Sequence, residues 1–191
     1  MRGSAGSFGI VTSIEVTTFP APPSATIFQY SWDLTVADAS NGIAVFQSFV
    51  QTNIPPEFGA EIVLGKGSAS GRVSFELSGG WYGAASKLNA TIAPLLEKLP
   101  KKPQTSLNVG TYINSVQVLA GDQSLNTNTA PDVHDTFYAK SLMTPASSPM
   151  SPAAIKAFIN YLAHEGFSSK TVRVVLFLHP TEALYPLAMV L

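Results

Sequence analysis

The sequence lacks several residue types and patterns on which whole classes of function depend. It has no cysteine, which excludes disulfides, thiolate metal sites and a cysteine nucleophile. Charged residues make up only 12% of the chain and the formal net charge is -1, so the basic surface typical of nucleic-acid or anionic-membrane binding is missing. Histidines and carboxylates are nowhere spaced like metal ligands. We therefore expect no metal, no nucleic acid and no membrane partner.

Long apolar runs are also missing. No run reaches the roughly 18 apolar residues of a membrane-spanning helix, and the start, Met1-Arg2-Gly3-Ser4, lacks the apolar stretch of a secretory leader. The sequence thus predicts a soluble chain without a leader and leaves its location unassigned. Apolar residues nevertheless make up 46% of the 191 residues. That is enough for the core of one compact domain or of part of a two-domain protein.

The first predicted strand covers residues 10–19, where β-branched residues follow a loop of small residues. Pro20, Pro22 and Pro23 should end it, because proline cannot donate a hydrogen bond to a sheet. This proline-rich stretch is the best candidate for a domain boundary.

The remainder of the chain alternates between strand and helix patterns. Strands are predicted at 26–33 and 171–178, a β-hairpin at 61–65 and 72–79, and helices at 38–53, 84–99 and 151–165. Pro94 is expected to interrupt the second helix and start a new one, whereas Ser151, Pro152 and Gly166 match the capping pattern of the third. Together these elements predict an α+β fold, with helices covering one face of a mainly antiparallel sheet.

A glycine-rich segment at residues 2–12 is the most informative stretch. Its small residues would let the backbone approach a ligand, and successive N–H groups could hold a phosphate. A flexible turn before a strand explains the same composition. It is not a Rossmann loop, because the segment precedes a strand instead of following one.

The amino-acid sequences of two segments resemble those of one enzyme family. Residues 2–12, Arg-Gly-Ser-Ala-Gly-Ser-Phe-Gly-Ile-Val-Thr, resemble the end of the flavin domain in FAD-linked oxidases of the berberine bridge enzyme family, also called the vanillyl-alcohol oxidase or PCMH type. Residues 134–142, His-Asp-Thr-Phe-Tyr-Ala-Lys-Ser-Leu, resemble a strand of the same family's substrate domain. Within the family, the likeness is greatest to fungal oligosaccharide oxidases, and it spans residues 2–174.

The resemblance implies an FAD-dependent oxidoreductase that oxidises sugar or alcohol hydroxyls with dioxygen and releases hydrogen peroxide. A tyrosinate-like base removes the hydroxyl proton in the sugar oxidases, and hydride passes to the flavin. Residues 1–22 would be the C-terminal end of a PCMH-type FAD-binding domain, 23–174 an incomplete substrate-binding domain and 175–191 a divergent tail. The residues implied to bind FAD, mainly through backbone atoms, are Gly3, Gly6, Ser7, Phe8, Gly9, Ile10 and Val11.

Some parts of the family pattern are missing from these residues. The family attaches its flavin through a histidine, and in many members a cysteine, that precede the Gly-Ile-Val strand, and its catalytic base follows the substrate domain. We therefore expect this chain to be a fragment without assigned catalytic residues, inactive by itself. The likeness ends near Val175, and a shifted reading frame or retained intron would explain residues 175–191.

Few other polar residues suggest chemistry. Tyr138 and Lys140 lie on one strand face and could contact sugar hydroxyls, and Trp81-Tyr82 could stack on a sugar or close the core. His134 and His164 suit capping or surface positions. Asn89-Ala90-Thr91 is a glycosylation sequon, which matters only in a secreted form.

Two functions remain open from the sequence. One is an FAD-linked oxidase fragment with a small-molecule, carbohydrate substrate; the other is a catalytically inactive, flavin-free binding module or truncated gene product. The resemblance suggests that the full-length form is extracellular. It does not specify which sugar is the substrate.

Overall fold

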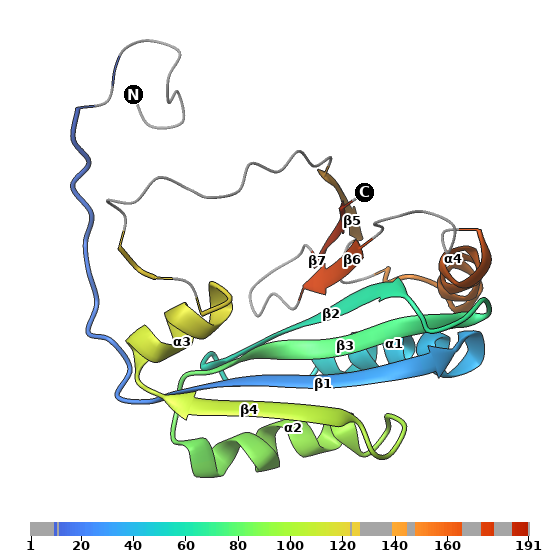
Figure 1. Ribbon diagram of the computed structural model, residues 1–191, viewed down its shortest axis with the longest axis horizontal. Helices are drawn as coiled ribbons and strands as arrows, with labels where there is room; N and C mark the ends of the chain where they lie inside the picture. The colour runs from blue at the N-terminus through green and yellow to red at the C-terminus, as the bar shows by residue number, and fades with distance from the viewer. Residues whose placement is uncertain are drawn as a thin grey trace.

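The computed structural model describes residue 10 and residues 12–122, 124–126, 139–144, 148–165, 173–177 and 185–190. Its centre is a seven-stranded sheet in the order β4-β1-β3-β2-β6-β7-β5, and every neighbouring pair is antiparallel (Figure 1). The strands are β1(Ala25–Thr35), β2(Phe58–Lys66), β3(Arg72–Trp81), β4(Gln104–Gly110), β5(Ala139–Thr144), β6(Arg173–Phe177) and β7(Tyr185–Val190). The predicted α+β class with a mainly antiparallel sheet is confirmed.

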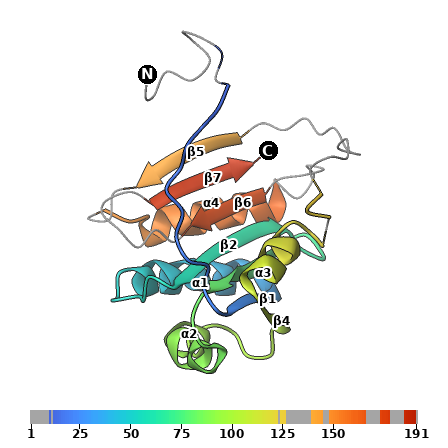
Figure 2. The ribbon, with the colours of Figure 1, turned by 90° about the vertical axis from the view of Figure 1, so that its left-hand side faces the viewer.

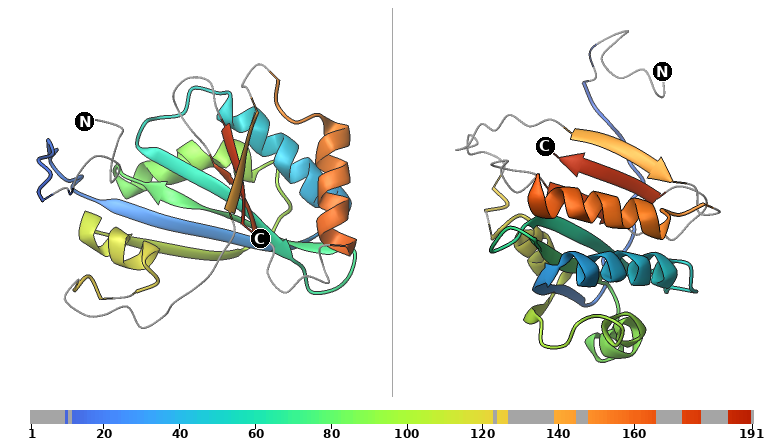
Figure 3. Two further views of the ribbon diagram at one scale, coloured as in Figure 1. Left: turned by 90° about the horizontal axis from the view of Figure 1, so that it is seen from above. Right: turned by 90° about the vertical axis from the view of Figure 1, so that its right-hand side faces the viewer.

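Helices α1(Val36–Val50), α2(Leu88–Leu96) and α4(Pro152–His164) cover one face of the sheet, and α3(Tyr112–Leu119) lies on the other side (Figure 1). A short 3-10 turn, η1(Ala85–Lys87), precedes α2. Helices α1 and α4 lie side by side, whereas α2 lies at the outer edge of the molecule (Figures 2 and 3). Helices α1, α2 and α4 therefore form one layer, and among the described residues α3 is the helix that covers part of the opposite sheet face.

The core lies between the sheet and this helical layer. In β1, Phe28, Tyr30 and Leu34 are buried and Trp32 on the same face is half-buried, as expected for a strand with one face against helices. Phe28 stacks on Phe58 of β2 with ring centroids 5.5 Å apart, and Phe49 of α1 meets Phe58 edge-on. The two faces of the sheet thus have different chemistry, apolar toward the helices and polar away from them.

Local signals in the sequence fix the helix starts. Thr35 caps α1 by accepting a hydrogen bond from the Asp38 backbone N–H, and Ser151 caps α4 in the same way through Ala154. The predicted cap of α4 at Ser151 and Pro152 is confirmed, while Gly166 lies outside the described residues.

The expectation that Pro94 divides the second helix is wrong. Helix α2 continues through Pro94, and the Glu97 N–H donates to the Ala93 carbonyl to resume the helical bonding. Buried Ile92 and Leu95 on either side hold this turn against the sheet, and this packing outweighs the one lost backbone hydrogen bond.

The expected strand over residues 10–19 is also wrong for its described part, Ile10 and residues 12–19. These residues pair with no strand and extend away from the sheet (Figure 1). Ile10 is 93% exposed and Phe19 is 84% exposed. The prediction failed because β-branched residues favour an extended backbone, whereas a strand also needs a neighbouring strand with which to form hydrogen bonds.

Removing residues 1–23 is expected to raise solubility, because the deletion removes the exposed side chains of Ile14, Val16 and Phe19. The measurement is the soluble concentration at fixed precipitant, with Ile14→Thr as a milder variant that should shift it in the same direction. Lower solubility after the deletion would contradict the exposed placement and would indicate that the segment packs on this chain.

Two elements near the middle of the chain have no counterpart in the sequence-based prediction. Strand β4 is exposed on both faces except at Gly110, and its sequence has only a short alternation at Leu107 and Val109. Helix α3 follows it and does carry a signal: Thr111 and Asn114 form a reciprocal capping box.

The C-terminal elements complete the sheet. The predicted domain boundary at residue 175 falls within β6, and β7 pairs with both β6 and β5. The division into residues 1–22, 23–174 and 175–191 stays a prediction. Among the described residues, no helix has the length and apolarity that crossing a membrane requires.

Candidate functional site

The sheet face opposite α1, α2 and α4 carries a strip of polar side chains, which belong to the neighbouring strands β1, β3 and β2. Gln29 of β1, Glu76 and Ser78 of β3 and Glu61 of β2 alternate with buried residues of the core. Ser78 lies directly between Gln29 and Glu61 in the sheet register. We call Gln29, Glu61, Glu76 and Ser78 the polar sheet face.

Two hydrogen bonds order this face. The Gln29 Nε2 donates to Glu76 Oε2 at 2.7 Å, and the Ser78 hydroxyl donates to Glu61 Oε1 at 3.4 Å. Each carboxylate therefore accepts one of these hydrogen bonds and keeps further acceptor capacity. The arrangement offers several hydrogen-bonding atoms on a rigid support, which suits a ligand with many hydroxyl groups.

These residues line an open groove of about 490 Å³. Gly59 and Gly80 form part of its floor, while Tyr82 and, from α3, Val118 and Leu119 contribute to its walls. A Cβ added at Gly59 would meet no atom within 4 Å, so the absence of a side chain there leaves free space. The groove is therefore bounded on one side by α3, the helix on this side of the sheet (Figure 1).

An aromatic pair lies beside the groove. The rings of Tyr82 and Tyr112 are 6.2 Å apart between centroids and tilted by 52°. Tyr112 is 40% exposed and Tyr82 lines the groove. Aromatic rings next to polar acceptors match the two surfaces of a pyranose, which has apolar C–H faces and a hydroxyl rim.

Burial raises the pKa of Glu61 above its ordinary value; the Ser78 hydrogen bond lowers it by less than burial raises it, and the negative charge of Glu76 adds the smallest increase. A carboxyl with a raised pKa binds a proton more readily in the folded than in the unfolded chain. Stability that comes from this proton is present at low pH and decreases as pH rises through the interval between the unfolded and folded pKa values.

Glu61→Gln should therefore stabilise the fold near pH 7 and lose this advantage below about pH 4. The gain is expected to be below about 1 kcal/mol, because partial solvent exposure screens the charge, and this corresponds to a rise in Tm of at most about 2–4 °C. Thermal unfolding of both proteins across this pH range is the measurement. A variant less stable than the wild type at pH 7 would show that Glu61 is stabilising as a carboxylate.

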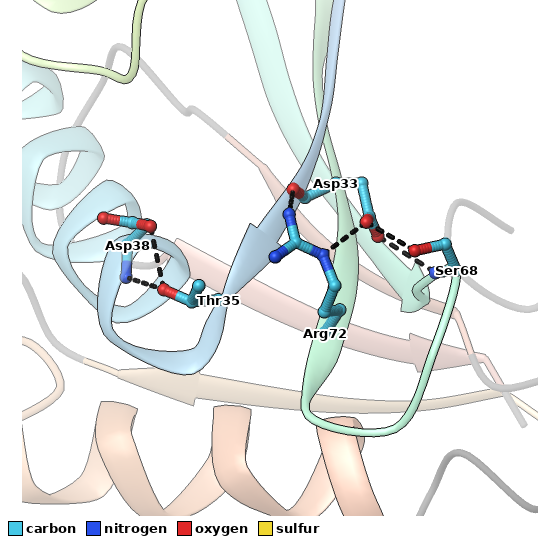
Figure 4. A network of polar contacts seen from close by, with 5 residues as sticks. All are labelled: Asp33, Thr35, Asp38, Ser68 and Arg72. Carbon is cyan, nitrogen blue, oxygen red and sulfur yellow. Dashed lines mark hydrogen bonds and ion pairs between the residues drawn. The ribbon is translucent and has the colours of Figure 1, made fainter.

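A second polar network lies at the other end of β1 and β3 (Figure 4). Arg72 Nε contacts Asp33 Oδ2 at 2.5 Å, and Ser68 donates to the same carboxylate through its hydroxyl and its backbone N–H. The hydrogen bonds from Ser68, with smaller contributions from Arg72, lower the pKa of Asp33. This network connects the β2–β3 turn to β1. The Arg72 guanidinium is paired with the Asp33 carboxylate in it.

Of the sequence-predicted site residues, the structure describes Ile10 and Lys140, and neither lines the groove at the polar sheet face. Gly3, Gly6, Ser7, Phe8, Gly9 and Val11 lie outside the described residues, as do Tyr138 and His134. Ile10 is exposed and far from any strand pairing. Lys140 lies in β5, at the opposite sheet edge from β4, where its backbone pairs with Met189. The roles given to these residues stay predictions.

Two other expectations can be compared directly with the structure. Trp81 is 4% exposed and its Nε1 donates to the Ala84 carbonyl at 2.9 Å, so it closes the core and does not form a sugar platform. Tyr82 does line the groove. His164 lies in the last turn of α4, with Nδ1 at 3.4 Å from the Ser70 hydroxyl, as expected for a surface position. Among the described residues no three potential ligands gather as a metal site.

Sequence reasoning missed the polar sheet face itself. The sequence did contain a signal for it. Glu61 and Glu76 each lie between apolar residues within a predicted strand, and glutamate is depleted in strands. The cross-strand position of Gln29 opposite Ser78 needs the register, which the sequence does not state.

Comparisons with known proteins point to one class. No protein-family profile matches the chain. The chain is 29% identical over 171 residues to chitooligosaccharide oxidase from Gibberella zeae, covering 88% of this chain and 32% of that protein. Its fold matches that of glucooligosaccharide oxidase from Acremonium strictum with a TM-score of 0.72 at 19% identity, over 90% of this chain and 39% of the other. Berberine bridge enzyme matches with a TM-score of 0.70 at 15% identity, over 91% and 36% of the two chains.

The fold is therefore that of the berberine-bridge-type oxidases. The homologues of this chain are fungal oligosaccharide oxidases, as residues 2–12 and 134–142 predicted. The homologous family is FAD-linked: the Acremonium enzyme carries a 6-S-cysteinyl, 8α-N1-histidyl FAD. The chain spans about a third of the length of the curated relatives that it matches, 32% and 31% for two of them.

Proposed function

We propose that this chain supplies the substrate-binding part of an FAD-dependent oxidase acting on sugar hydroxyls, and that the polar sheet face forms a wall of its sugar pocket. One observation carries the proposal: an open groove on a rigid sheet is lined by Gln29, Glu61, Glu76 and Ser78 and flanked by Tyr82. Carbohydrate oxidation by the relatives supports the same assignment.

The charge of the groove favours a neutral ligand. Glu61 and Glu76 would repel a phosphate, and no Lys or Arg is among the residues that line the groove within the described part of the chain. Sugar hydroxyls can both donate to these carboxylates and accept from the Gln29 amide. The groove thus fits an uncharged oligosaccharide and does not fit the diphosphate of FAD.

The cofactor would need other residues. By family resemblance we assign its backbone contacts to Gly3, Gly6, Ser7, Phe8, Gly9, Ile10 and Val11, and we assign sugar contacts to Tyr138 and Lys140. Bound FAD would accept a hydride from the oxidised carbon, and dioxygen would then be reduced to hydrogen peroxide. The polar sheet face would orient the sugar by hydrogen bonds to hydroxyls next to that carbon. We further propose that the full-length form is extracellular.

The experiment joins residues 24–191 to the flavin-binding part of the Gibberella zeae enzyme, in place of its matching segment. We expect a yellow protein that releases hydrogen peroxide with cello- or chito-oligosaccharides. Glu76→Ala should lower kcat/KM by about tenfold or more, because it removes an acceptor and leaves the Gln29 amide unpaired.

The matched control is Lys98→Ala, an exposed position just past α2 on the helical side, which should leave kcat/KM unchanged. Equal kcat/KM in a flavin-loaded Glu76→Ala protein would contradict the role of the polar sheet face. A folded chimera that binds sugar but yields no peroxide would favour the flavin-free binding module.

A further inference from the structure

The sequence contains a single Asn-x-Ser/Thr tripeptide, Asn89-Ala90-Thr91, and the proposed function does not use it. It lies in the first turn of α2, at the outer edge of the molecule (Figure 2). Asn89 and Ala90 are exposed, whereas Leu88, Ile92 and Leu95 face the core. The asparagine side chain is therefore exposed to solvent on a helix of the layer that covers the sheet face opposite the polar sheet face.

The two polar side chains of this tripeptide differ in their hydrogen bonding. The Thr91 hydroxyl donates to the Lys87 carbonyl at 3.1 Å, a bond to the preceding turn. In the described part of the chain, the Asn89 side-chain amide has no hydrogen-bond partner. A group attached to its nitrogen would therefore displace no internal interaction of the fold.

A shallow apolar groove of about 330 Å³ borders Asn89. Trp32, Ile92, Leu96 and Pro100 contribute to its lining. Trp32 is half-buried and donates through Nε1 to the Pro100 carbonyl at 2.9 Å, which holds the indole in place. An apolar groove with a fixed indole matches the C–H face of a hexosamine, and a sugar attached to Asn89 would be tethered beside it.

We propose that Asn89 is an N-glycan attachment site and that the first sugars of the glycan cover the groove at Trp32. In the secretory pathway, the Asn89 amide nitrogen attacks the anomeric carbon of an oligosaccharide bound to a lipid diphosphate. The C–N bond forms, the C–O bond to phosphate breaks, the lipid diphosphate leaves, and the amide gives up one proton. The proposal rests on the extracellular form proposed above and not on the oxidase chemistry, because α2 lies on the helical side of the sheet, opposite the polar sheet face.

The test expresses the full chain behind a secretion leader in a eukaryotic host. We expect one glycan on the secreted protein, seen as a single mobility step that peptide-N-glycosidase removes with conversion of Asn89 to aspartate in the peptide map. Asn89→Gln and Thr91→Ala should abolish the step, and Thr91→Ser should retain it, because serine completes the sequon. Circular dichroism shows that the variants are folded. A secreted wild-type chain without this glycan overturns the site.

Acrylamide quenching of tryptophan fluorescence tests the groove. The chain has two tryptophans, and Trp81 is only 4% exposed, so quenching reports mainly on Trp32. The glycosylated protein should show a smaller Stern–Volmer slope than Asn89→Gln, and enzymatic removal of the glycan should restore the larger slope. Equal slopes in all three forms would overturn coverage of the groove.

Discussion

Gly79→Ala is expected to destabilise the fold by about 3 kcal/mol or more, which lowers Tm by roughly 6–12 °C. Gly79 lies in the central strand β3, with β1 on one side and β2 on the other. A Cβ at this position would collide with the Gly59 carbonyl oxygen and lie 2.7 Å from Phe28 Cζ and 2.9 Å from Ala60 Cα. Two of these atoms belong to backbone, which cannot move without separating the strands.

The matched control is Gly59→Ala, on the neighbouring strand. A Cβ there meets nothing within 4 Å, so the change in free energy of unfolding should stay within about 0.5 kcal/mol. Thermal and urea unfolding of the two variants provide the comparison. Equal stability of both variants would contradict the close approach of β2 and β3 at Gly79.

Hydrogen peroxide production should be absent when residues 1–191 are mixed alone with excess FAD and cello- or chito-oligosaccharides. Hydride transfer needs the reacting C–H held against the flavin and a base within hydrogen-bond reach of the hydroxyl. The polar sheet face supplies one wall of a sugar pocket, and a single loop of backbone N–H groups would contact only a small part of so large a cofactor. The measurement is a coupled peroxide assay, with free FAD and sugar as the background.

The control for this assay is the chimera with the Gibberella zeae flavin-binding part, which should be active under the same conditions. Sugar-dependent peroxide from the isolated chain, abolished by heating, would contradict the prediction. It would mean that a complete catalytic centre lies within these residues.

The fold was predictable where the apolar pattern and the local capping residues indicate the same element. The apolar stripe of Ile155, Ile159 and Leu162 and the cap at Ser151 both indicate α4, and the structure confirms it. The hairpin was predictable because the small residues 67–71 separate two alternating segments, and the structure places Gly71 in this turn with a φ of 84°, which suits glycine. Strand β4 was not predicted, since its apolar alternation is limited to Leu107 and Val109, both of which are exposed at the sheet edge.

The candidate site was much less predictable than the fold. The family resemblance rests on residues 2–12 and 134–142. These segments predicted the family, but they do not include the residues that line the groove. The groove depends instead on Gln29, Glu61 and Glu76, which are distant in sequence and meet only through the order β1-β3-β2. Such a juxtaposition is a property of register, and no short motif encodes it.

A nuclear magnetic resonance titration of the isotope-labelled chain with cello- and chito-oligosaccharides tests most directly whether the polar sheet face binds sugar. We expect saturable shifts for the backbone amides of Gln29, Glu61 and Ser78 and for the Gln29 side-chain amide, with little change at Ile43 in α1. Glu76→Ala should weaken this binding and Lys98→Ala should not. Shifts confined to the helical side, or equal affinity of the Glu76→Ala chain, would contradict a sugar-binding role for the polar sheet face.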